Sequence, residues 1–564
     1  MATSPLLVNA CIGTLLAAIV IQAVAFLADT WKKRSLMKRL SEQGKPMPPF
    51  NLLMGHLLSA KSAADALPPS AHSVYILNSL AAQHAPQGAY YVDFTPMAWP
   101  MLVVTDPYLA TQVVEHPVVG SRKPDELYAW FHPITNGQSL FTQNGAAWKR
   151  DRDYFLPFFS NQNLDASVPF VVGQMAIFRD KLREKARGDG GMFVLEPLIL
   201  SMMNDIIGKL VLNADLGTQH GSHPLATTML RQLRLKFAVN NPLDNLGQLN
   251  PLKVFNLWNN SRMLDNHIKS QIDTRLQAWR LKKTQDEQND FKSLLDVALE
   301  AYMNQDNTAS SPRTDVSTAF SKTLCSQMRM FFFAGYDSTA STMAYCCYTA
   351  WQHPEALRKM RAEHDQVFGH RSQRPDDDDA ALDAIRANPA VLNALPYTTA
   401  VIKETMRLFP AANGIRQGHR DLVLRDGQGN EFPTDGCSVQ MLHYAIQRSP
   451  KVWARPSEFL PERFLVEPGH ELYPAKGAWR PFEYGPRLCT GQQLVMKELK
   501  AFLVLLAREF DIKECYSEFD GDRKMDLTNV DFEKAHLVEA GAAHPRANFP
   551  CRVSFSEYQT STSI

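Results

Sequence analysis

Cysteine is scarce in this 564-residue chain, and its placement excludes two common structural devices. The eight cysteines are scattered and none falls in a CxxC pair, so neither a structural zinc site nor a disulfide framework is expected. The sequence also lacks a charge excess. Its formal net charge is +1, which argues against nucleic acid as a partner. No GxGxxG motif follows a strand-like run, so no dinucleotide site is predicted.

Charge is also absent from the stretch Leu6–Ala28. About 23 helical residues extend over roughly 34 Å, which is enough to cross a bilayer. No lysine or arginine precedes this stretch, whereas a basic segment begins at Lys32. The positive-inside rule therefore places the N-terminus outside and the rest of the chain in the cytosol. A buried core helix is the alternative. We predict a membrane anchor over 1–31, a basic, proline-rich linker over 32–50 and one globular domain over 51–564.

Helical periodicity dominates the remainder of the chain. We predict helices over Ser167–Arg187, Pro197–Leu212, Phe255–Lys283, Asp290–Met303, Ser317–His353, Pro354–Phe368, Tyr397–Phe409 and Gln492–Phe510. Strand-like runs are fewer and lie at 88–94, 100–105, Leu422–Leu424 and Glu431–Thr434. Two polar stretches, 304–317 and 369–381, are predicted to be surface loops. The expected fold class is therefore mainly α with a minor β part.

One short stretch, FEYGPRLCTG, surrounds a cysteine with residues that turn the backbone, directly before a helical run. The residues at fixed offsets are Phe482, Gly485, Arg487, Cys489 and Gly491. Free N–H groups and the helix dipole favour a thiolate at a helix N-terminus. The glycines allow the backbone to approach a flat ligand, the arginine offers a planar fork for a carboxylate, and the phenylalanine can cover the sulfur. An inert buried thiol is the alternative, but it leaves the other four residues unexplained.

The pattern Phe-x-x-Gly-x-Arg-x-Cys-x-Gly resembles the haem-binding loop of the cytochrome P450 superfamily at all five positions. This resemblance implies a P450 fold, a haem b cofactor whose iron is bound by the Cys489 thiolate, and a monooxygenase that uses O2. Because no flavin or nucleotide motif is present, it also implies a separate electron donor, NADPH-cytochrome P450 reductase, with cytochrome b5 as a second candidate. The microsomal type is a single-pass protein of the endoplasmic reticulum membrane with a cytosolic catalytic domain.

Two charged segments agree with this resemblance. KETMR places Glu404 and Arg407 three residues apart, on one face of a helix, and PERF supplies Arg463. Taken alone, such a pair is usually a solvated surface salt bridge that stabilises the fold by roughly a few tenths of a kcal/mol. The resemblance implies instead that the three residues form a buried scaffold network behind the haem.

The stretch FFFAGYDST lies inside the longest predicted helix. Glycine and hydroxyl residues are weak helix formers, so a kink or bulge is expected there. Ala334, Gly335, Asp337, Ser338 and Thr339 resemble the family's oxygen-activation segment, in which the acid relays protons and the adjacent alcohol assists. The family usually has threonine directly after the acid, whereas this chain has serine and then threonine. A serine that bonds only the preceding helical turn is the alternative.

Weaker resemblances suggest which residues contact the haem propionates and the reductase. The candidate donors to the haem propionates are Trp148, Arg152 and Arg416. A basic face for the reductase is expected near the cysteine loop, formed by Arg480, Arg487, Lys497 and Lys500.

Several segments, among them AKGAWRPFEYGPR and AGAAHPRANFPCRV, look like those of fungal secondary-metabolite cluster enzymes of the versicolorin and sterigmatocystin type. The resemblance implies hydroxylation or epoxidation of a small hydrophobic polyketide, terpenoid or meroterpenoid. One rival function is an O2-independent isomerase or dehydratase of an oxidised intermediate, against which Asp337 and Ser338 argue. A non-catalytic haem-binding scaffold is the other.

Overall fold

The structure is a computed structural model that describes residues 5–237, 250–281, 291–304, 317–370, 380–522, 530 and 533–558. The helices are α1 (Pro5–Glu42), α2 (Leu57–Asp65), α3 (Ser73–His84), α4 (Pro107–Glu115), α5 (Glu126–Thr135), α6 (Gly145–Phe155), α7 (Asn161–Arg187), α8 (Glu196–Leu212), α9 (Pro224–Phe237), α10 (Pro251–Leu281), α11 (Leu294–Met303), α12 (Thr318–Gln352), α13 (Pro354–Phe368), α14 (Ala380–Ala387), α15 (Pro396–Leu408), α16 (His443–Ile446), α17 (Gln492–Ala507) and α18 (Tyr516–Asp520). The strands are β1 (Ala89–Val92), β2 (Met101–Val104), β3 (Phe193–Val194), β4 (Gly414–Gln417), β5 (Val423–Arg425), β6 (Glu431–Pro433), β7 (Ser438–Met441), β8 (Phe510–Glu514), β9 (Leu537–Glu539), β10 (Ala543–Pro545) and β11 (Pro550–Phe555).

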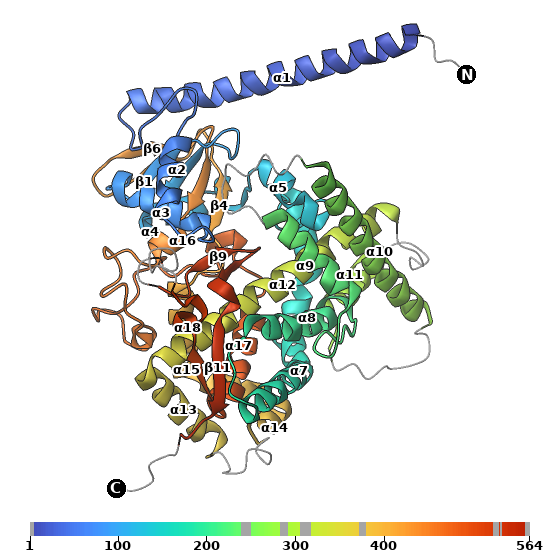
Figure 1. The fold of residues 1–564 in the computed structure, drawn as a ribbon, viewed down its shortest axis with the longest axis vertical. Coiled ribbons are helices and arrows are strands. Elements are labelled where there is room, and N and C mark those ends of the chain that lie inside the picture. The colour runs from blue at the N-terminus through green and yellow to red at the C-terminus, as the bar shows by residue number, and fades with distance from the viewer. Residues whose placement is uncertain are drawn as a thin grey trace.

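Helix α12 runs through the centre of the molecule, with α8, α15 and α17 around it (Figure 1). Nearly all of its residues from Leu324 to Ala350 are buried, as expected for a helix covered on every side. Its contact with α8 is close at Gly335, where a Cβ would lie 2.8 Å from Ile207 Cδ1. The residues of this range that are not buried lie between 331 and 338: Ala334 is exposed, and Gly335 and Ser338 are half-buried. The segment that resembles the oxygen-activation stretch is therefore the accessible part of an otherwise buried helix.

Part of the β structure, including β1, β4 and β6, lies beneath α1, whereas β9 and β11 lie further from α1, among the helices (Figure 1). A four-stranded mixed sheet has the order β1-β2-β7-β4, in which β2 and β7 are parallel and the other pairs antiparallel. Strands β1 and β2 are buried on both faces, which explains their almost continuous apolar sequence. A second sheet has the order β3-β11-β8, and β5-β6 and β9-β10 are two-stranded. The β10 strand packs against α12 and so reaches the centre of the fold.

The mainly helical fold with a minor β part agrees with the prediction, as do the positions of the predicted helices and strands. Several boundaries differ. The helices predicted to begin at Ser167, Phe255 and Asp290 begin at Asn161, Pro251 and Leu294. The helix predicted to end at Phe510 ends at Ala507, and Phe510 begins β8. The loops predicted at 304–317 and 369–381 lie largely outside the described residues.

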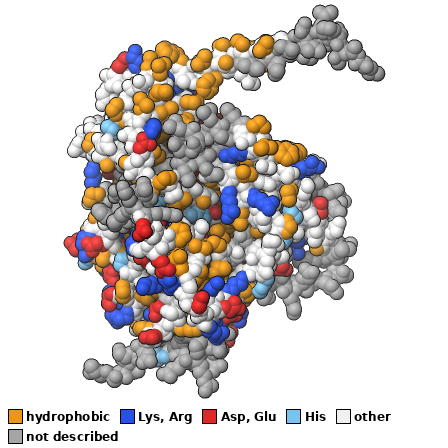
Figure 2. Space-filling view, viewed as in Figure 1, with side chains coloured by type: hydrophobic (Ala, Val, Ile, Leu, Met, Phe, Trp, Pro, Cys, Tyr) orange, Lys and Arg blue, Asp and Glu red, His pale blue; other side chains and the backbone are white. Residues whose placement is uncertain are grey.

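The N-terminal helix differs from its prediction in one important respect. Over the described residues, no helix is both long and apolar enough to cross a membrane, so the transmembrane anchor over 1–31 is not supported. The helix α1 itself runs past that boundary to Glu42 without a break. Its last turns belong to the globular part, since Met37 is buried and Arg34 forms a buried ion pair with Asp93 at 2.5 Å. Apolar side chains are exposed along the projecting part of α1 (Figure 2).

Candidate active site

The cysteine loop is a tight structure directly before α17. Cys489 N donates to Phe482 O at 2.9 Å, and the 3₁₀ turn η7 (Gly485–Arg487) lies between them. Gly485 has a φ of 77°, a left-handed conformation that favours glycine. Phe482 is buried next to Trp479, with ring centroids 6.0 Å apart. The loop therefore presents Cys489 from a fixed backbone.

Cys489 is exposed, whereas the other cysteines whose side chains the structure describes are buried. Desolvation by the surrounding protein raises the pKa of the Cys489 thiol, whereas hydrogen bonds from the backbone N–H groups of Gly491 and Gln492 lower it. The predicted effect of the helix N-terminus is therefore present, but desolvation by the surrounding protein outweighs it, so the pKa of the thiol is raised overall. An accessible thiol with a raised pKa gives up its proton when a metal binds. Its accessibility and single position fit a ligand to haem iron.

Arg487 lies within the same loop and points toward the α5–α6 region. Its guanidinium donates to the carbonyl oxygens of Ser121, Leu140 and Gln143 at 2.6, 2.9 and 2.6 Å. It also lies 4.2 Å from the centroid of the Trp148 ring. Among the described residues, Arg487 pairs with no carboxylate, so its half-buried charge has no matching anion.

Two further cations lie near Arg487. Arg416 is fully buried, donates to Gly120 O at 2.8 Å and reaches Glu483 Oε1 at 3.2 Å. Burial and the neighbouring arginines hold the pKa of Lys123 well below its usual range. Burial and the other cations also lower the pKa of Arg487 to about 9. Cations that repel one another in a buried position fit a ligand with negative charge, such as the two propionates of haem.

One of the four residues predicted to form a basic surface for a reductase is not at the surface. Arg480 is fully buried and donates to Thr111 Oγ1 at 2.9 Å. Lys497 Nζ pairs with Asp165 at 2.6 Å, and Lys500 Nζ donates to a backbone carbonyl. The prediction is wrong for Arg480, because nearness to the cysteine loop in the sequence does not show which side chains the fold covers. Arg487, Lys497 and Lys500 are half-buried, and docking of a reductase beside them stays a prediction.

The oxygen-activation stretch remains a regular helix. Helix α12 is continuous through it, so the predicted kink or bulge is absent. Ser338 Oγ donates to Ala334 O at 2.8 Å, which is the local bond considered as the alternative. Thr339 is buried, and its hydroxyl has no hydrogen-bond partner among the described residues. Of the two alcohols, Thr339 is therefore the one whose hydrogen bonding a ligand or water would complete.

Asp337 is enclosed rather than open to water. Its Oδ2 accepts from Ala542 N at 2.6 Å, and its Oδ1 lies 3.2 Å from His544 Nε2. The other ring nitrogen of His544, Nδ1, lies 2.6 Å from Glu196 Oε1. Sequence reasoning missed both partners, because His544 follows Asp337 by 207 residues and no local pattern links them.

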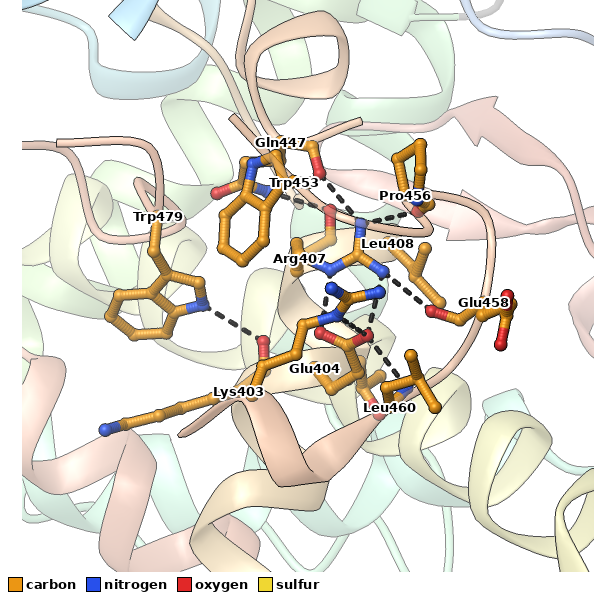
Figure 3. A network of polar contacts seen from close by, with 12 residues as sticks. Lys403, Glu404, Arg407, Leu408, Gln447, Trp453, Pro456, Glu458, Leu460 and Trp479 are labelled. Atoms are coloured by element: carbon orange, nitrogen blue, oxygen red, sulfur yellow. Dashed lines mark hydrogen bonds and ion pairs between the residues drawn. The ribbon is translucent and has the colours of Figure 1, made fainter. Parts of the chain in front are cut away.

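Glu404, Arg407 and Arg463 are brought together in one fully buried network. Arg407 Nε lies 2.7 Å from Glu404 Oε2, and Arg463 Nε lies 3.1 Å from Glu404 Oε1. Figure 3 shows the remaining donors of Arg407 directed at the backbone around it. These donors meet the carbonyl oxygens of Gln447, Pro456 and Glu458. The network joins α15 to the 3₁₀ turn η6 (Pro461–Phe464), which is consistent with a scaffold role.

The sequence profile of the Cytochrome P450 family matches residues 49–528. The chain belongs to this family. The P450 is 35% identical to cytochrome P450 monooxygenase polC of Polytolypa hystricis, over 94% of this chain and 93% of that protein. It is 29% identical to cytochrome P450 monooxygenase acrF of Aspergillus aculeatus, over 83% and 94%. The crystal structure of the cytochrome P450DA haem domain has a TM-score of 0.66 and 20% identity, covering 91% of this chain and 98% of that one, which shows the fold.

This P450 is therefore a haem-thiolate monooxygenase whose cofactor is protoporphyrin IX haem. Cys489 is the residue of the family's loop pattern that bears the thiol, and the buried cations nearby suit the propionates. Of the predicted propionate donors, Trp148 has its ring centroid 4.2 Å from the guanidinium group of Arg487 and 5.7 Å from that of Arg152. Arg416 is bound to Glu483 instead of projecting freely.

Proposed function

We propose that this P450 hydroxylates or epoxidises a hydrophobic secondary metabolite, a polyketide, terpenoid or meroterpenoid, in a fungal biosynthetic pathway. The observation that carries the proposal is the accessible Cys489 thiol in an intact haem-loop pattern, in a chain similar over nearly its whole length to a fungal P450 monooxygenase. The segments quoted above that resemble enzymes of metabolite clusters suggest the substrate class.

The side chains take separate parts in this reaction. The bound haem supplies the redox chemistry that activates O2. Cys489 would hold the iron, and Phe482, Gly485 and Gly491 would shape the loop around it. Arg487, with the donors Trp148, Arg152 and Arg416, would orient the propionates.

Proton supply falls to α12. Asp337 would pass protons toward the oxygen, with the hydroxyls of Ser338 and Thr339 completing the path beside Ala334 and Gly335. Glu404, Arg407 and Arg463 would keep the fold behind the haem rigid and take no part in the chemistry.

The electrons must come from outside this chain. Hydroxylation consumes one O2, two electrons and two protons, and yields the alcohol and one water. We assign the electrons to NADPH by way of NADPH-cytochrome P450 reductase, with cytochrome b5 as a second donor. We further propose that the protein is attached to the endoplasmic reticulum membrane through the exposed apolar side chains of α1, with the catalytic domain on the cytosolic side.

Labelled oxygen gives the direct test of this function. The haem-loaded protein, a P450 reductase and NADPH would be incubated under ¹⁸O2 with a panel of polyketides and terpenoids, and the products measured by mass spectrometry. We expect a product with one ¹⁸O atom that forms only with NADPH and O2. Conversion that proceeds without either would contradict the proposal and favour the isomerase or dehydratase function.

A further inference from the structure

Three titratable side chains from distant parts of the chain form a buried line in this P450. Glu196 begins α8, His544 lies in β10 and Asp337 lies in the middle of α12. His544 Nδ1 is 2.6 Å from Glu196, and Nε2 is 3.2 Å from Asp337. Their exposed fractions are only 1% for Glu196, 6% for His544 and 3% for Asp337. The imidazole ring therefore joins two carboxylates in a site that is largely shielded from water, in which His544 keeps the most exposure.

The turn between β9 and β10 is built to close over Asp337. Ala542 N donates to Asp337 Oδ2, and Gly541 has a φ of 130°. A Cβ on Gly541 would lie 2.6 Å from the same carboxylate oxygen, so glycine is needed for the approach. The Ser341 hydroxyl, one turn along α12 from Asp337, donates to Ala543 O and fixes the turn to the helix. Oδ2 of Asp337 is thus engaged by the turn, and Oδ1 by His544 in the strand that follows it.

The surroundings of His544 favour its charged form. Burial alone would lower the pKa of His544, but Glu196 and Asp337 outweigh it and raise this pKa well above 6.5. His72 also lies near His544, and its pKa is lowered by burial and, in part, by His544. Tyr336 interacts with Asp337, and burial raises the pKa of its hydroxyl well above the usual range. Tyr345 and Tyr516 face Glu196, and burial raises the pKa of both, so they stay neutral. An imidazolium therefore sits beside the acid of the oxygen-activation stretch.

We propose that His544 is a positioning residue that, together with Glu196, holds the proton supplied to Asp337 during oxygen activation. This rests on the proposed monooxygenase function. When the Nε2 proton of His544 moves to Asp337 Oδ1, the imidazolium becomes a neutral imidazole that still donates Nδ1–H to Glu196. Glu196 thus stabilises the charged ring before the transfer and keeps its orientation afterwards, and solvent returns the proton. The competing explanation is a purely structural role, in which the contacts of His544 hold the β9–β10 turn against α8 and α12.

The charge on His544 has a signature in thermal stability that does not depend on activity. Because its pKa is raised on folding, its stabilising contribution is complete below about pH 6.5 and is lost as pH rises through the folded pKa. We expect the difference in Tm between wild type and His544→Gln to be largest at low pH and to shrink as pH rises.

His364 is the matched control, because burial lowers the pKa of this histidine to about 3. Its contribution is complete above about pH 6.5 and is lost as pH falls toward 3. The difference in Tm between wild type and His364→Gln should therefore shrink as pH falls, in the opposite direction. A His544→Gln difference that follows the His364→Gln pattern would overturn the assignment of a charged His544.

Proton delivery is tested without a substrate by the fate of O2. The haem-loaded protein, reductase and NADPH release H2O2, or reduce O2 further to water, which needs two additional electrons and two additional protons. We expect His544→Gln to slow water formation by about tenfold and to release correspondingly more H2O2 per NADPH. In wild type the amount of H2O2 released per NADPH consumed should rise only at a pH above the folded pKa of His544. In Glu196→Gln the rise should shift to lower pH, and His364→Gln should match wild type.

The outcomes separate the two proposals. If wild type lacks the spectrum of a thiolate-ligated haem, the proposed function fails. If that spectrum is intact and both His544→Gln and Glu196→Gln show the wild-type H2O2 ratio at every pH, the relay is wrong and the function stands. If His544 has only a structural role, the variants should change Tm without changing the pH at which H2O2 release per NADPH rises. If His544→Gln fails to bind haem, the relay is tested by Glu196→Gln alone. The relay is supported if H2O2 release rises at a lower pH in this variant than in wild type, and it is wrong if the two rise at the same pH.

Discussion

Replacing Cys489 with alanine is expected to abolish the strongly red-shifted Soret band that the reduced wild-type protein gives with carbon monoxide. The band requires a thiolate on the iron, and Cys489 is the described cysteine that is exposed, in a loop fixed by its bond to Phe482. Product formation under ¹⁸O2 should fall to background in the same variant. The measurement is the difference spectrum of the reduced protein with and without carbon monoxide.

The control for this experiment is another cysteine. Cys437 is buried, and burial raises the pKa of its thiol to about 12, so it stays a neutral thiol. Cys437→Ala should keep the red-shifted band. In Cys489→His, an imidazole replaces the thiolate, so any haem that binds should lack the red shift. Persistence of the band in Cys489→Ala would show that another residue ligates the iron and would refute the central assignment.

The sequence was most informative where function depends on neighbours in the chain. Phe482, Arg487 and Cys489 lie within one loop, so fixed offsets were enough to predict the cofactor. Glu404 and Arg407 share a helical turn, and their predicted pairing is present in the structure. In both cases the local spacing sets the geometry, and the rest of the fold only encloses it.

Long-range packing decided the features that the sequence did not predict. Gly335 predicts a kink when read locally, but the helix is regular there and the glycine allows α8 to approach, with Ile207 against it. Arg487 was predicted as a carboxylate clamp, yet its donors meet carbonyl oxygens from a segment more than 340 residues earlier in the chain. His544 and Glu196 reach Asp337 only through the folding of β10 and α8 onto α12. The periodicity of a sequence does not predict such contacts, because they depend on which helices and strands pack together.

Glu404→Gln is expected to destabilise the protein by about 3–5 kcal/mol, the usual cost of removing one partner from a buried ion network. The carboxylate is the anion that both Arg407 and Arg463 contact, and all three side chains are fully buried. Burial already lowers the pKa of Arg407, and Glu404 opposes that effect, so its loss leaves two desolvated cations side by side. The free energy of unfolding, from urea denaturation of the haem-loaded protein, measures the change.

An exposed pair of the same chemistry supplies the control. Arg425 lies 2.8 Å from Glu431 in the β5–β6 hairpin, with both side chains more than half exposed. Glu431→Gln should therefore change the free energy of unfolding by less than about 1 kcal/mol. Arg463→Lys keeps the charge but loses the planar fork, including the donor that Arg463 gives to Arg455 O, so an intermediate loss of about 1–3 kcal/mol is expected. If Glu404→Gln costs no more than Glu431→Gln, the network is not what holds α15 to η6, and the scaffold role assigned to it is wrong.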